Sequence, residues 1–402
     1  MTCPRRRPRP AGWAGLFVLG LAATAATASP PPFELKDGDR VVFLGGTFVE
    51  REQASGHLEA MLTARFPDRG VTFRNLGWSG DTVRGEARAR FGKAADGFAH
   101  LKEHVEALRP TVLFVSYGLN ESFAGKAGLP AFGRDLGTLL DVLDRTGARV
   151  VLITPRRLED LGPPLPDPAP ANARLGDYVE VLRRAAASRG YRLVDLFDGW
   201  KPDPGRPMTD NGVHLTDDGY REAAGVIGRA LGLGASPARL ALRPDGTAPD
   251  ATGGTLSGVE ASPGRTSFRF VLDRLPLAPD PALTLVLGDA GPIGRRLRID
   301  RGVAIELDRA GDPAEIGLLH GPDVDQAARL RAAIVAKNEL YFHRWRPQNE
   351  TYLFGFRKHE QGNNAREIPQ FDPLVAAKEA EIAGLRKPVP HTYEITRKAA
   401  GR

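Results

Sequence analysis

Four short segments of the chain hold the side chains best suited to chemistry on a carbonyl group. Thr47 offers a hydroxyl, Asn120 a side-chain amide and His214 an imidazole, while Gly80 leaves its backbone N–H open to close approach. A threonine hydroxyl acts as a nucleophile when a base is adjacent, and its β-methyl group restricts its rotamers. The alternative for Thr47 is that it caps the segment after it or binds a ligand.

Predicted strands and helices alternate around these segments. Strands are expected at the apolar runs 41–44, 71–76, 112–117, 149–154 and 192–197, and helices at 58–66, 98–108, 136–143, 175–188 and 218–231. This alternation predicts a parallel sheet covered by helices on both faces. Ligands bind such sheets outside the carboxyl ends of the strands, and all four segments lie at strand ends or in the last loop.

The order and spacing of these segments resemble the four sequence blocks of the SGNH (GDSL-type) hydrolases. The blocks fall at residues 45–47, 75–82, 118–121 and 211–214, so the resemblance covers residues 41–220. It implies a flavodoxin-like three-layer α/β/α domain with a five-stranded parallel sheet. It also implies hydrolysis of esters with no metal or organic cofactor.

The resemblance assigns a role to each residue of the set. Thr47 stands where the family has its nucleophilic serine, after two glycines in place of Gly-Asp. The backbone N–H of Gly80 and the amide of Asn120 would hold the oxyanion, and His214 would be the base. A turn glycine, a loop-capping asparagine and a structural histidine are the alternatives for the last three.

The fourth block departs from the family pattern at its acid. Asn211 stands three residues before His214, where the family has aspartate, and Asp210 is its neighbour. An amide at this place can lower the rate of a serine protease by about 10⁴. Asp210 or a backbone carbonyl could replace the acid, the dyad could work alone, or catalysis could be lost. Because neighbours on an extended segment point in opposite directions, Asn211 is the expected partner of the imidazole.

Further residues are candidates for substrate binding. Trp78 and Glu121 lie inside the second and third blocks, and His343 and Arg344 lie in a polar, aromatic stretch at 337–350. That stretch either completes the rim of the site or acts as a structural clamp on the first domain.

Two other patterns compete with this assignment. His100 and His104 have the i, i+4 spacing of a zinc site, but they point away from the buried stripe of their helix and no third ligand is evident. Ser79 lies in a sequence similar to a nucleophile elbow without its last glycine. An α/β-hydrolase with Ser79 as nucleophile is therefore the alternative fold.

Four parts are expected along the chain. They are a signal peptide at 1–28, the SGNH-type domain at 33–235, a small β-sandwich-like domain at 238–310, and a helical C-terminal extension at 311–402 that packs on the first domain. The β domain rests on short strand-like runs at 266–272, 282–287, 297–299 and 303–307. Helices are expected at 323–345 and 374–385.

The first residues have the features of a secretory signal. Four arginines precede a short apolar run at 15–26, and small residues allow cleavage near Ala28, so secretion or a periplasmic location is expected. Loss of these arginines from the 55 basic residues leaves 51 against 49 acidic ones, and Cys3, the single cysteine, is lost as well. No basic block indicates nucleic acid, and no integral membrane span is expected in the mature chain.

The sequence therefore predicts a secreted ester hydrolase that acts on an acylated carbohydrate or another small polar ester. Its partner would be a small-molecule or glycan ester. The alternative is a catalytically inactive SGNH-fold protein that binds glycans or serves as a scaffold, which the altered first and fourth blocks favour.

Overall fold

The computed structural model describes residues 31–201, 203, 205–234, 237–243, 250–277, 279–288, 294–307 and 314–397. The predicted signal peptide at 1–28 lies outside the described residues. Residues 33–402 form one compact unit, and the description below concerns this unit alone. No helix in its described part is long and apolar enough to cross a membrane.

A parallel sheet forms the first part of this unit. Within the described residues its strands are β1 (Arg40–Gly45), β2 (Thr72–Gly77), β3 (Val112–Ser116), β4 (Arg149–Ile153) and β5 (Arg192–Val194), in the order β2-β1-β3-β4-β5. Every pair in the sheet is parallel. The predicted flavodoxin-like domain is thereby confirmed, and the alternative α/β-hydrolase fold is wrong.

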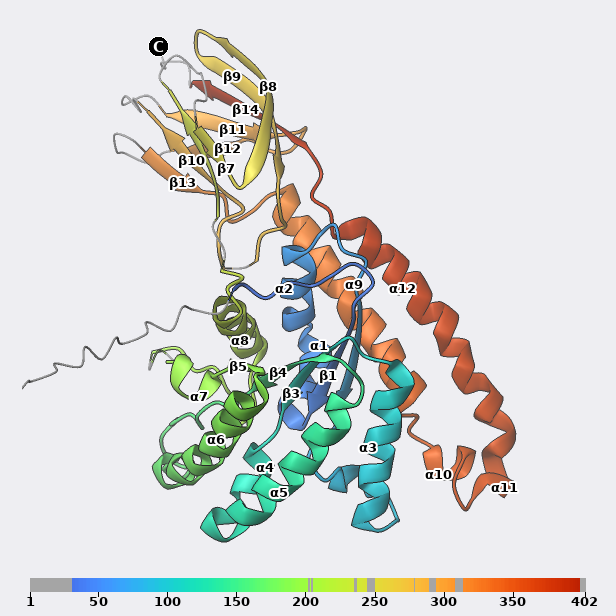
Figure 1. Ribbon diagram of the computed structural model, residues 1–402. Helices are drawn as coiled ribbons and strands as arrows, with labels where there is room; N and C mark the ends of the chain where they lie inside the picture. Colours follow the sequence, from blue (N-terminus) through green and yellow to red (C-terminus); the bar gives the residue numbers. More distant parts are fainter. Residues whose placement is uncertain are drawn as a thin grey trace, which may run out of the picture. The chain divides into compact units, whose positions relative to one another are not determined.

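Helices cover both faces of this sheet (Figure 1). They are α1 (Thr47–Ser55), α2 (His57–Arg65), α3 (Ala94–Leu108), α4 (Leu119–Ser122), α5 (Gly125–Asp144), α6 (Ala169–Arg189), α7 (Leu196–Gly199) and α8 (Asp217–Ala230), with a 3-10 turn η1 (Glu86–Ala89). Alternate strand residues enter different cores: Val41 and Phe43 pack under α2 and α8, and Val42 and Leu44 under α3 and α5. The continuous apolar runs in the sequence thus reflect burial on two faces.

The backbone at the carboxyl end of β1 lies very close to that of β3, and the backbone at the end of β2 lies very close to α1. A β-carbon at Gly45 would lie 2.4 Å from the carbonyl oxygen of Ser116, and one at Gly77 would lie 2.1 Å from the backbone nitrogen of Glu50. Only glycine fits at either position. This packing lets α1 begin at Thr47, two residues after β1 ends, and fixes its first turn against the neighbouring strands.

Two further sheets pack face to face over a shared apolar core. One has the order β13-β10-β6-β7 and the other β12-β11-β14-β9-β8. Their strands are β6 (Ala238–Leu242), β7 (Asp250–Thr252), β8 (Gly254–Ser262), β9 (Arg265–Leu272), β10 (Leu283–Leu287), β11 (Arg295–Ile299), β12 (Ile305–Leu307), β13 (Ala314–Gly317) and β14 (His391–Arg397).

The sandwich differs from the β domain expected at 238–310. Strands β13 and β14 lie beyond residue 310, and β14 pairs with both β9 and β11. The segment after residue 311 is therefore not only helical, because its end returns to complete a sheet. A strand whose partners are remote in sequence leaves no local signal of that pairing.

The long helix after the sandwich packs on the first domain. It is α9 (Pro322–Trp345), followed by α10 (Glu350–Leu353), α11 (Lys358–Gln361), a 3-10 segment η2 (Gly362–Gln370) and α12 (Phe371–Leu385). Apolar residues Leu330 and Ile334 of α9 join Ala60 and Ala64 of α2 in one buried cluster.

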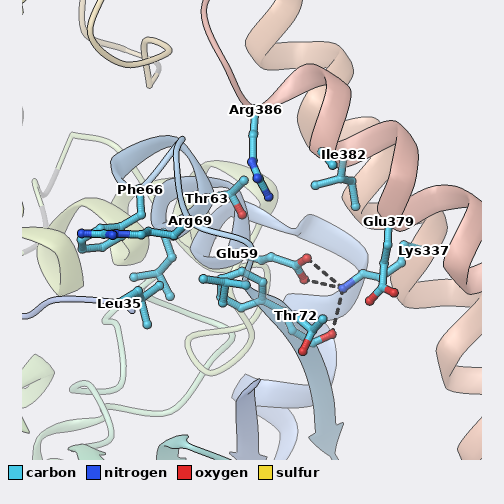
Figure 2. Close-up of a pocket in the computed structure, with 14 residues that line it drawn as sticks. Leu35, Glu59, Thr63, Phe66, Arg69, Thr72, Lys337, Glu379, Ile382 and Arg386 are labelled. Carbon is cyan, nitrogen blue, oxygen red and sulfur yellow. Dashed lines mark hydrogen bonds and ion pairs between the residues drawn. The ribbon is translucent and has the colours of Figure 1, made fainter. Parts of the chain in front are cut away.

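A buried ion pair lies within this interface, beside a small cavity of about 50 Å³. Figure 2 shows the Lys337 ammonium group between the Glu59 carboxylate and the chain of β2. The Nζ atom donates to both Glu59 oxygens at 2.8 and 2.9 Å and to the carbonyl oxygen of Phe73 at 3.1 Å. Burial lowers the pKa of Lys337 and raises that of Glu59, so each charge depends on the other.

Replacing one member of this pair should cost much more stability than replacing both. Lys337→Met leaves a buried carboxylate without its cationic partner, so we expect a loss of about 3–5 kcal/mol in the free energy of unfolding. The double variant Lys337→Met/Glu59→Leu should recover most of that loss. Urea unfolding measures both, and the control Lys102→Met, at an exposed pair, should stay within about 0.5 kcal/mol of wild type. Equal losses of unfolding free energy in Lys337→Met and Lys102→Met would contradict this role of the buried pair.

Candidate active site

A cavity of about 250 Å³ opens at the carboxyl edge of the parallel sheet. Thr47 at the start of α1, Asn120 in α4 and His214 in the loop before α8 all line it. The walls come from the ends of β1, β3 and β4 and from that last loop, at the point where the strand order reverses. Gly80 does not line the cavity but lies next to Thr47.

The Thr47 hydroxyl is bonded to the second sequence block, residues 75–82. Its oxygen accepts a hydrogen bond from the Gly80 N–H at 3.3 Å. Among the described residues no hydrogen bond joins this hydroxyl to His214. As the first residue of α1, Thr47 also carries a backbone N–H that has no partner within the helix, at the positive end of the helix dipole.

The Asn120 amide links the second and third blocks. Its Nδ2 donates to the carbonyl oxygen of Asp81 at 2.8 Å, which uses one of two N–H bonds and leaves the other for a ligand. Asp81 is itself fixed, because its carboxylate accepts from Arg88 at 2.7 Å and from Tyr117 at 3.1 Å. The loop that carries Gly80 is thus tied to a rigid, buried network.

Asn211 contacts the imidazole of His214. Its Oδ1 accepts the backbone N–H groups of Val213 at 3.0 Å and His214 at 2.8 Å, and its Nδ2 lies 3.1 Å from His214 Nδ1. The two backbone bonds fix the amide orientation, because the flipped amide would place donors against donors. An amide nitrogen can only donate, so His214 Nδ1 must be the acceptor.

This hydrogen bond selects the tautomer of the imidazole. A neutral ring that accepts at Nδ1 carries its proton on Nε2, whereas a general base needs a free lone pair on Nε2. The family aspartate favours the opposite tautomer, since a carboxylate accepts from Nδ1–H. The substitution at position 211 therefore stabilises the form of His214 that donates and disfavours the form that takes a proton.

Asp210 does not replace the missing acid. Its carboxylate lies 3.7 Å from the Arg51 guanidinium, and its backbone N–H donates to the carbonyl oxygen of His214 at 3.0 Å. Burial and then the nearby charge of Arg51 lower the pKa of His214 below its ordinary value of 6.5. The ring is consequently neutral at pH 7.

Of the candidate binding residues, the cavity contains one. Glu121 lines it, yet its two oxygens accept the N–H groups of Val83 at 2.9 Å and Gly118 at 2.8 Å, which shapes the loop. His343 packs against Phe342 and Phe371, and Arg344 pairs with Asp372 at 2.8 Å. Neither lines the cavity, because both lie where α9 meets the later helices.

Trp78 is buried beneath the end of α9 and does not line the cavity either. The guanidinium of Arg346 lies 3.6 Å from the centre of its ring, and Trp345 packs against it edge-on. Arg346 also pairs with Glu50 at 3.3 Å, and Glu50 accepts the N–H of Ser79, next to Gly80. The C-terminal extension thus supports the loop that carries Gly80.

His100 and His104 take part in the same packing. His104 lies edge-on to Trp345, and His100 Nδ1 contacts the carbonyl oxygen of Arg88 at 2.9 Å. The described residues include no cluster of three side chains that could hold a metal ion. His104 therefore lies against the end of α9 and His100 against the 3-10 turn η1, which their spacing alone did not reveal.

Comparison with known proteins agrees with this geometry. Residues 38–222 match the sequence model of the GDSL-like lipase/acylhydrolase family. This match and the fold support an SGNH-type hydrolase domain at residues 38–222. The family match supports an ester hydrolase, and no curated protein matches the chain.

A solved structure shares the fold of most of the chain. It is described as a gut microbial diltiazem-metabolizing enzyme and matches with a TM-score of 0.71 and 17% identity, over 91% of this chain and 99% of that one. An acetylxylan esterase from Geobacillus stearothermophilus matches with a TM-score of 0.41 and 20% identity, over 50% of this chain and 97% of the other. The first match shows that the fold of nearly the whole chain occurs elsewhere.

Two arginines that line the cavity were not predicted from the sequence. Arg51 lies four residues after Thr47 on α1, a spacing that places both on one helix face and could have revealed it. Arg156 follows β4, and its Nη2 donates to the carbonyl oxygens of Gly212 at 3.2 Å and Val213 at 3.1 Å. Nothing in the local sequence links Arg156 to the histidine loop.

Arg346 should act as a positioning residue for the Gly80 loop. Arg346→Met keeps an unbranched, flexible side chain but removes the guanidinium and its contacts with Trp78 and Glu50, so we expect kcat for ester hydrolysis to fall about 10-fold. KM and the melting temperature should change little. Arg229→Met, at an exposed pair on α8, should leave both constants unchanged. If Arg346→Met lowered the melting temperature and left kcat unchanged, the role of Arg346 would be structural only.

Asn211→Asp should raise the rate, because a carboxylate can accept from Nδ1–H while keeping the two backbone bonds. We expect kcat/KM to rise at least 10-fold, about 1.4 kcal/mol. The wild-type acid limb should lie below pH 6.5, since the pKa of His214 is lowered. The new negative charge should raise that pKa and move the limb to higher pH. An unchanged rate and pH profile in Asn211→Asp would show that the hydrogen-bond partner of His214 Nδ1 does not affect the rate.

Proposed function

We propose that this protein hydrolyses esters by acyl transfer to Thr47. The observation that carries this proposal is the shared cavity of Thr47, Asn120 and His214, with Gly80 bonded to the Thr47 hydroxyl. These groups supply a hydroxyl, an imidazole and fixed N–H donors, which acyl transfer requires.

The reaction would proceed in two halves. His214 Nε2 takes the hydroxyl proton as Thr47 Oγ1 attacks the ester carbonyl, and N–H groups of Thr47, Gly80 and Asn120 stabilise the oxyanion. The protonated imidazole then gives its proton to the leaving alcohol. Water, deprotonated by the same ring, releases the acid from the acyl-threonine.

Asn211 would slow this reaction without preventing it. The base form of His214 has Nδ1–H facing the Asn211 N–H, a clash of two donors worth about 1–3 kcal/mol. The active tautomer is then about 5 to 150 times less populated. We therefore propose a slow hydrolase, secreted or periplasmic, whose substrate is an acylated carbohydrate or another small polar ester.

A second function has a specific observation in its favour. The amide at position 211 stabilises the imidazole tautomer that carries its proton on Nε2. That N–H can donate a hydrogen bond to a bound ligand, which is the role expected of it in a binding site. A protein of this kind would bind a glycan or a glycan ester in the cavity and release it unchanged.

The Thr47 hydroxyl distinguishes the two functions. Thr47→Ser removes only the crowding methyl, so hydrolysis of acetyl and p-nitrophenyl esters should persist or increase. Thr47→Val removes the hydroxyl at nearly constant shape and should reduce hydrolysis to the background rate. The assay is release of p-nitrophenol by the purified mature chain. Full activity of the valine variant would move the nucleophile elsewhere, with Ser79 next to test, and an inactive wild type would favour the binding protein.

A further inference from the structure

Arg51 is the charged group of the cavity with the fewest partners. Its guanidinium forms one long ion pair, 3.7 Å to Asp210, and makes no hydrogen bond within the described part of the chain. About two-fifths of the side chain is exposed (43%), so solvent and ligands can reach it. A guanidinium has five N–H donors, which suit a carboxylate in a bidentate pair.

The other charged side chains in the cavity wall are already engaged. Arg156 donates to backbone carbonyl oxygens, and Asp81 pairs with Arg88. The carboxylate of Glu121 accepts backbone N–H groups with both oxygens. A ligand that enters therefore meets Arg51, whose ion pair with Asp210 is 3.7 Å long, as the charged side chain with the most N–H donors left for a ligand among these residues.

The position of Arg51 relates it to the reacting ester. It lies one helical turn after Thr47, so their β-carbons are about 6 Å apart. The start of α1 adds the positive end of the helix dipole. The charge of Arg51 also reaches His214, whose pKa it helps to lower. In a substrate whose carboxylate binds Arg51 while its ester carbonyl lies at Thr47, the two groups would thus be only a few bonds apart.

We propose that the cavity takes esters that also carry a carboxylate, and that Arg51 binds this carboxylate as a specificity-determining residue. The inference rests on the ester hydrolysis proposed above and narrows its substrate class. Apolar side chains of the wall, among them Phe123, Leu158 and Leu196, would contact the carbon chain of the substrate.

A matched pair of esters tests this inference. Monomethyl succinate carries one carboxylate, and dimethyl succinate is its neutral counterpart. Wild type should prefer the monoanion, and Arg51→Gln should lower kcat/KM for it at least 10-fold while changing the value for the neutral ester less than twofold. Arg145→Gln removes the same charge from an exposed position on the domain and should change neither value. Equal effects of Arg51→Gln on both esters, or none on either, would overturn the inference.

A binding measurement separates this inference from the proposed reaction. If wild type hydrolyses neither these two esters nor the acetyl and p-nitrophenyl esters, the proposed function fails, and calorimetric titration of Thr47→Val with the two succinate esters decides the inference. Tighter binding of the monoanion that is lost in Thr47→Val/Arg51→Gln would support it. Equal binding of both esters, or no binding of either, would overturn it.

Discussion

The close approach of backbones at the carboxyl ends of β1 and β2 is the constraint on which the site depends. Glycines at positions 45 and 77 remove the β-carbons that would meet the backbones of Ser116, at the end of β3, and Glu50, in α1. As a result α1 starts almost directly after β1, the loop after β2 bonds to its first residue, and the loop after β3 bonds to that loop. The parallel sheet then brings segments from four parts of the chain to one cavity.

Within this frame, the fourth block departs from the family pattern by the exchange of one terminal atom, while the first block has Gly45-Gly46-Thr47 in place of Gly-Asp-Ser. Aspartate and asparagine have the same shape, and the Oδ1 of Asn211 still accepts two backbone N–H groups. The other terminal atom is a donor in place of an acceptor, and this reverses the tautomer that the imidazole prefers. Fold and cavity are thus retained while the base is weakened, which explains why a binding function competes with hydrolysis.

Much of the first domain could be predicted because its signals are local. Apolar runs that are buried on two faces gave the strands, and the blocks at their ends gave Thr47, Asn120 and His214. The parts that could not be predicted depend on contacts between remote residues. Lys337 and Glu59 are 278 positions apart, and β14 completes a sheet begun near residue 254. Arg346 could not be predicted for the same reason, because its partners Trp78 and Glu50 are remote from it in the sequence.

The protonation of His214 is the most direct test of the central claim that Asn211 fixes the imidazole tautomer. Long-range ¹H–¹⁵N correlation spectra of ¹⁵N-histidine-labelled protein at pH 7.5, with the His214 signals assigned by comparison with His214→Gln, report which ring nitrogen carries the proton. The hydrogen bond from Asn211 predicts a neutral ring with a bare Nδ1 and a protonated Nε2. A ring protonated on Nδ1 with a bare Nε2, as a general base requires, would contradict this prediction.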